Sequence, residues 1–206
     1  MPFGSFLKTI LNSHYTVWLV LALPAPALLA DIARHERYYA EIMYESGLLS
    51  VQLMVLALAI TPLLHILRWS NSAVVVLRWM QKRRRAIGVA AFGYALLHTF
   101  FYIRETGAFD LILLEMADIE LTTGWLAFVI MTVLAFTSNN LSVRKLGRRW
   151  KLIQRTIYIC AALTALHWLL IDQFLRELPI WSLPLIVLQT FRLLLLGLKT
   201  ATSHSR

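Results

Sequence analysis

The chain has 206 residues and a net charge of +9; 59% of its residues are hydrophobic and only 15% are charged. A soluble domain averages roughly 45–50% apolar and about 25% charged residues, so this composition excludes an ordinary soluble enzyme. A positive net charge is compatible with nucleic-acid binding, but its distribution, described below, indicates a membrane, and we expect no nucleic-acid partner.

The apolar residues form six blocks of membrane-spanning length. In chain order they lie at roughly 15–33, 48–68, 86–104, 121–137, 153–171 and 179–198. A helix of about 20 apolar residues spans a hydrocarbon core of ~30 Å. The sequence therefore predicts an all-α integral membrane protein built as a six-transmembrane-helix bundle.

The charged residues predict the orientation of this bundle. With the N-terminus inside, the inside segments carry 16 of the 20 Lys and Arg residues, whereas all 11 acidic residues fall outside. Basic residues mark the cytoplasmic side of membrane proteins. We therefore expect an N-in/C-in topology with a cytoplasmic tail at 1–14, a transmembrane domain at 15–198 and a second cytoplasmic tail at 199–206. The basic clusters are interpreted as orientation signals that contact the headgroups of the lipid bilayer.

The first apolar block leaves two alternatives open. Its short apolar stretch and the small residues near Ala25 and Ala27 resemble a cleaved signal peptide. The apolar run that reaches Ala33 and the single upstream basic residue, Lys8, favour a retained helix. We expect the helix to be retained.

Two of the six histidines lie deep within predicted helices. His98 is 12 residues and His167 is 14 residues from the inner end of its block, which corresponds to depths of about 18 and 21 Å. An ionisable side chain inside a membrane helix is unfavourable and indicates a functional site. Small residues such as Ala95 and Thr164 accompany them at helical spacing. Two neutral imidazoles across a bundle core can bind heme iron, although an interhelical hydrogen bond without a cofactor is the alternative.

The other candidate ligands are weaker. His65 lies near the inner end of the second block and is interpreted as an interfacial polar residue. The single cysteine, Cys160, is expected to pack in the core, since one cysteine cannot form a thiolate metal cluster.

Three segments carry a resemblance to a known family. Arg84 and Arg85 lead into Gly-x-x-x-Phe-x-Tyr-Ala-x-Leu-His, which ends at His98; Thr-Ser follows at 137–138, and Arg-x-Leu-Gly-x-x-Trp occupies 144–150. Over about 47–172, the chain resembles the ferric-reductase-like transmembrane family. The resemblance is closest to a bacterial branch that supplies the heme-binding membrane subunit of a periplasmic methionine sulfoxide reductase system.

The resemblance implies transfer of electrons through heme b in the bacterial inner membrane. The donor would be quinol of the respiratory pool or a flavin (FMN), and the acceptor a periplasmic molybdopterin-containing reductase, which would hold the catalytic residues. His98 and His167 fall on the axial ligands of the heme iron. Arg84 and Arg85 fall where a flavin phosphate is held, and two arginines at a helix start would suit a phosphate; plain inside-positive anchoring is the alternative. Arg104 would contact either a heme propionate or a lipid headgroup.

One residue departs from the pattern of the family. Gln154 replaces the histidine that the family has on the inner side of the fifth helix, so the resemblance implies one heme and favours quinol as the donor. Two other functions remain open. One is a stand-alone ferric-reductase-like oxidoreductase that acts on a small acceptor at the outer face, and the other is a heme-free scaffold or transporter.

Overall fold

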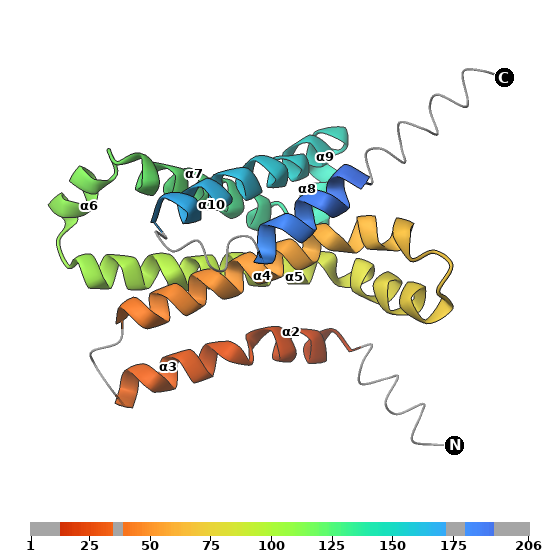
Figure 1. Cartoon of the computed structure of the whole chain (residues 1–206), viewed down its shortest axis with the longest axis horizontal. Coiled ribbons are helices and arrows are strands. Elements are labelled where there is room, and N and C mark those ends of the chain that lie inside the picture. The colour runs from red at the N-terminus through yellow and green to blue at the C-terminus, as the bar shows by residue number, and fades with distance from the viewer. Residues whose placement is uncertain (1–12, 35–38, 172–179, 192–206) are drawn as a thin grey trace.

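The computed structural model describes residues 13–34, 39–171 and 180–191, and the regular elements of these residues are all helices (Figure 1). Four spans are long and apolar enough to cross a membrane. They are α4 (Tyr39–Ile66), α5 (Asn71–Thr106), α7 (Ile119–Phe136) and the segment Arg148–Ile171, which comprises α9 (Arg148–Arg155) and α10 (Ile157–Ile171). The all-α prediction is confirmed, and the chain is a multi-pass membrane protein.

The first and last predicted spans correspond to shorter apolar helices. The first block forms α2 (His14–Ala22) and α3 (Pro24–Arg34), which meet at a turn before Pro24. The last block forms a helix over Ile180–Phe191. The tail at 199–206 and nearly all of the tail at 1–14 lie outside the described residues.

The four long spans form two helical hairpins. Helix α4 packs along α5, and α10 packs along α7, while contacts between α5 and α7 join the two pairs. All four contribute to one buried cluster, which consists of Met54, Leu58, Ala91, Ala127, Met131 and Cys160. Figure 1 shows α6 (Phe109–Glu115) at one end of the bundle and α8 (Asn140–Leu146) with α9 at the other.

Helix α5 is much longer than its apolar block. It begins at Asn71 rather than near Ala86, so the basic run that ends at Arg85 is helical. Lys, Arg, Gln and Met are good helix formers, and a charged run therefore ends an apolar block without ending the helix. The other end of α5 is closed by Gly107, whose φ of 70° is left-handed and whose N–H donates to the carbonyl of Ile103 at 3.1 Å.

Two side-chain hydrogen bonds attach the shorter helices to the bundle. Each involves a backbone carbonyl three or four residues before a proline. Gln189 Nε2 donates to the carbonyl oxygen of Leu58 in α4 at 3.1 Å. Pro62, four residues later, has no N–H to donate to that carbonyl. Near the turn before Pro24, the hydroxyl of Tyr94 in α5 donates to the carbonyl of Leu21 at 2.8 Å.

We predict that Gln189→Leu lowers the free energy of unfolding by about 1 kcal/mol, because it leaves the Leu58 carbonyl without this donor inside the membrane. The measurement is reversible unfolding in mixed micelles. In a Pro62→Ala background the backbone N–H of residue 62 can serve the same carbonyl, so the loss should be smaller. An equal loss in both backgrounds would show that the carbonyl is not the relevant partner.

Candidate functional site

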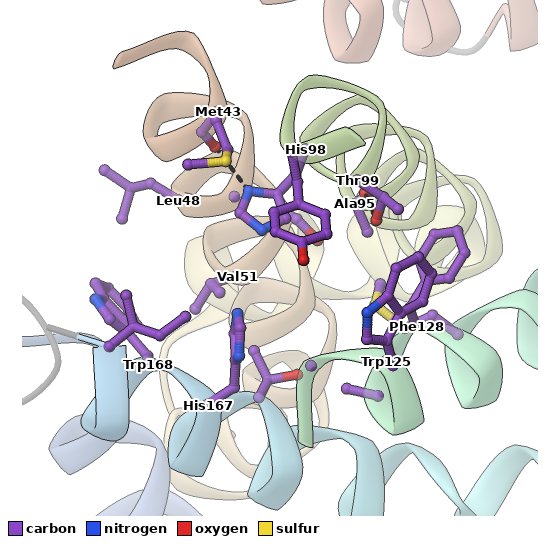
Figure 2. Close-up of a pocket in the computed structure, with 18 of the residues that line it drawn as sticks. Met43, Leu48, Val51, Ala95, His98, Thr99, Trp125, Phe128, His167 and Trp168 are labelled. Carbon is purple, nitrogen blue, oxygen red and sulfur yellow. Dashed lines mark hydrogen bonds between the residues drawn. The ribbon is translucent and has the colours of Figure 1, made fainter. Parts of the chain in front are cut away.

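The structure brings the two deep histidines together. His98 extends from α5 and His167 from α10, and their ring centres lie 6.4 Å apart with the ring planes at 85°. Figure 2 shows the two rings pointing toward each other from opposite sides of the site. Since α5 and α10 belong to different hairpins, this contact lies where the two hairpins meet.

Each imidazole is held through its Nδ1 atom by a backbone carbonyl. His98 Nδ1 lies 2.7 Å from the carbonyl oxygen of Met43 in α4, and His167 Nδ1 lies 2.7 Å from that of Glu120 in α7. A carbonyl only accepts, so each Nδ1–H donates and each Nε2 of the neutral ring keeps a free lone pair. Within the described part of the chain, neither Nε2 has a hydrogen-bond partner.

The histidines lie in a cavity of about 360 Å³ formed by both hairpins. Its lining combines aromatic residues with small residues, which leave space for a ligand. The small residues are Gly47, Ser50, Ala95, Thr99, Gly124, Ala127 and Thr164. The hydroxyls of Ser50 and Thr99 donate to main-chain carbonyls at 2.9 Å each. Tyr102 donates to Glu115 Oε2 at 2.6 Å. The cavity is therefore largely apolar, and the two imidazole nitrogens are the ligands in it that point toward each other.

A metal site made of protein ligands alone is not formed in the described regions. No group of three or more His, Cys, Asp or Glu side chains there is arranged to bind an ion. A metal held by His98 and His167 would need its remaining ligands from a cofactor or from water.

The three arginines from the sequence analysis lie away from the two imidazoles. Arg104 is exposed, lies 5.7 Å above the ring of Tyr39 and does not line the cavity. Arg84 donates to Thr61 Oγ1 at 3.5 Å, and Arg85 donates to Asn140 Oδ1 at 2.8 Å. The expectation that Arg84 and Arg85 stand at a helix start is wrong, because α5 begins at Asn71 and its free N–H groups lie there.

At the level of Gln154, side-chain contacts join α7 to α9 and to α5. Gln154 Nε2 donates to Thr137 Oγ1 at 3.1 Å and to the Leu134 carbonyl at 3.4 Å, which joins α9 to the end of α7. Between α5 and α7, the ring of Phe92 lies 5.8 Å from that of Phe128 and 6.5 Å from that of Phe136. Gln154 thus has a structural role in this chain.

Sequence reasoning assigned no role to the helix turns that face the two imidazoles. These turns contain Met43 with Gly47 and Glu120 with Gly124. The available signal was a glycine inside an apolar helix, since nothing in a sequence marks a backbone carbonyl as an acceptor.

Comparison with known proteins places more than half of the chain in a family. Residues 46–165, more than half of the chain, match the family described as "Ferric reductase like transmembrane component". The protein-methionine-sulfoxide reductase heme-binding subunits MsrQ of Brucella ovis, Brucella canis and Brucella suis are each 34% identical over 128 residues. Each alignment covers 60% of this chain and 54% of the relative, so the chain spans about half the length of the curated relatives it matches.

No solved structure matches the chain. The family match covers α5, α7 and most of α4 and α10, and it includes His98. It also confirms the resemblance inferred from the sequence motifs. The chain therefore belongs to the ferric reductase-like transmembrane family.

Proposed function

We propose that this chain is a heme-binding membrane subunit that passes electrons to a periplasmic methionine sulfoxide reductase, and that one heme b lies between His98 and His167. The observation that carries the proposal is the pair of imidazoles facing each other with free Nε2 atoms inside an apolar cavity. The curated relatives support it, because they are named as heme-binding subunits of a protein-methionine-sulfoxide reductase.

The separation of the two rings fits a single metal atom between them. A bond from a metal to an imidazole nitrogen is about 2 Å long, and the ring centre lies about 1.1 Å beyond that nitrogen. Two imidazoles on opposite sides of one metal atom therefore have ring centres roughly 6.3 Å apart. The distance here is 6.4 Å. The apolar walls suit the faces of a porphyrin, which supplies the four remaining ligands.

The hydrogen bonds of the two rings set what His98 and His167 can do. Donation from Nδ1–H to a carbonyl fixes the tautomer, orients Nε2 into the cavity and makes that nitrogen a stronger ligand. Bound heme supplies a one-electron iron couple. If His98 and His167 both held the iron of a bound heme, no position on the iron would remain for a substrate, so the site would suit electron transfer rather than bond chemistry.

We propose a single heme and quinol as the electron donor. An amide at position 154 that already donates to Thr137 and Leu134 is a poor heme ligand. The two histidines lie in the outer half of their spans, at a level that quinol reaches within the bilayer. FMN is the weaker alternative, since Arg84 and Arg85 already contact Thr61 and Asn140.

We also propose that the chain crosses the bacterial inner membrane six times, with both termini in the cytoplasm. The segregation of basic and acidic residues supports this topology, in which the two shorter apolar helices belong to the first and last spans. The reductase that accepts the electrons would then dock at the acidic outer side.

We predict that the purified protein binds one low-spin b-type heme per chain and that His98→Ala and His167→Ala each abolish this spectrum, because each removes an axial ligand. Pyridine hemochrome quantification together with oxidised and reduced spectra measures both quantities. His65→Ala is the matched control, since His65 is exposed at the end of α4 and should leave the heme unchanged. Retention of the spectrum in either of the two ligand variants would refute the assignment, and two hemes per chain would refute the role given to Gln154.

We predict that green fluorescent protein fused after residue 206 fluoresces and that alkaline phosphatase inserted after Gly107 is active, since the first reporter works only in the cytoplasm and the second only outside. Exchanging the two reporters provides the control. A dark C-terminal fusion would contradict a sixth span, because α10 should end on the outer side.

We predict that the reduced protein is reoxidised faster by a periplasmic methionine sulfoxide reductase with its sulfoxide substrate than by a ferric chelate. Stopped-flow absorbance of the heme band measures both rates. A reaction without the sulfoxide is the control, because it shows how much heme a single turnover of the reductase oxidises. Fast oxidation by the chelate alone would instead assign the chain to direct reduction of a small acceptor at the outer face.

A further inference from the structure

A glycine faces each of the two imidazoles at an equivalent position. Gly47 lies four residues after Met43 in α4, and Gly124 lies four residues after Glu120 in α7. Met43 and Glu120 are the residues whose carbonyls accept the imidazole N–H groups. Each hairpin therefore contains the same construction, namely a carbonyl acceptor and a glycine one turn further on. We call each construction a glycine notch.

Each notch leaves no room for a side chain. A Cβ atom at position 47 would lie 2.8 Å from Nδ1 and 3.2 Å from Cε1 of His98. A Cβ atom at position 124 would lie 2.7 Å from both Nδ1 and Cε1 of His167. Real Cβ atoms essentially never approach within 3.0 Å of another heavy atom, so each ring would have to move.

Helix geometry explains why the hydrogen bond and the glycine occur together. In an α-helix the carbonyl of residue i points along the axis toward the N–H of residue i+4, so a bulky ring that reaches this carbonyl from the side can come to lie against residue i+4, as both imidazoles do here. A Cβ at position 47 or 124 would then occupy the space of the ring. Because the ring nitrogen is bound to the carbonyl beside it, the ring cannot yield without losing that bond.

We propose that Gly47 and Gly124 are positioning residues for heme binding: each glycine notch seats one axial imidazole so that its Nδ1–H reaches the carbonyl and its Nε2 points into the cavity. The inference rests on the proposed function of His98 and His167. It adds that the two notches set the angle of 85° between the ring planes, since each ring is fixed against the helix that contains its notch.

The test compares Gly47→Ala and Gly124→Ala with Gly88→Ala and Gly93→Ala. A Cβ at either control position meets nothing within 4 Å, and both controls lie in α5, the helix that carries His98. Alanine in a helix is intrinsically more favourable than glycine, so a control substitution should leave stability unchanged or raise it. The two notch variants should instead lose about 10- to 100-fold in heme affinity, as expected for loss of an interaction that orients a ligand.

The readouts are heme titration of the apoprotein and the low-spin ferric electron paramagnetic resonance spectrum of the loaded protein. Perpendicular axial imidazoles give a strongly axial signal, and tilting of one ring in a notch variant should reduce that anisotropy while the controls keep it. Wild-type protein without heme would refute the proposed function itself. Wild-type protein with heme, combined with notch variants that match the controls in both readouts, would refute only the present inference.

A notch variant that fails to fold still tests the inference through a double substitution. If the methyl group of Gly47→Ala acts by displacing the ring, removing the ring should relieve the defect. Gly47→Ala/His98→Ala should then fold as well as His98→Ala alone, measured by helical content and unfolding temperature of the apoprotein. A defect that persists in the double variant would overturn the proposal, because the alanine would be acting on something other than the imidazole.

Discussion

A neutral imidazole inside a membrane has an N–H group that must find an acceptor, and in this protein the main chain provides it twice. Met43 and Glu120 accept from His98 and His167, each within one hairpin. These bonds use the Nδ1 side of each ring and leave the Nε2 side to face the other hairpin. The cavity between the hairpins, the separation of the rings and the need for glycine at 47 and 124 all depend on this division of the two ring nitrogens.

The same physical rule governs the periphery of the bundle. A backbone carbonyl that lacks its helical donor is unfavourable in lipid, and neighbouring side chains can supply a donor. Pro62 removes the donor of the Leu58 carbonyl, and Gln189 from the last described helix bonds to that carbonyl. The proline therefore gives α4 a polar attachment point in an otherwise apolar surface.

The sequence was informative where long-range order follows from composition. Apolar blocks located the four long spans, and counting residues from the basic ends placed His98 and His167 at one level. It was less informative where the same change in polarity can mark either a membrane boundary or the end of a helix. The end of the apolar block at Ala86 marks a membrane boundary but not a helix end, so the start of α5 and the setting of Arg84 and Arg85 were misplaced. The carbonyls of Met43 and Glu120 were invisible because main-chain acceptors are the same in every residue.

The amide of Gln154, which donates to Thr137 and to the Leu134 carbonyl, has a consequence for energy coupling. Moving one elementary charge across a whole membrane against a potential of 100 mV costs about 2.3 kcal/mol. With one heme at the outer level and quinol as its donor, the electron path proposed here runs only through the outer part of the bilayer. An electron on this path would cross only a fraction of the membrane potential. The rate of electron transfer should therefore depend little on the size of that potential.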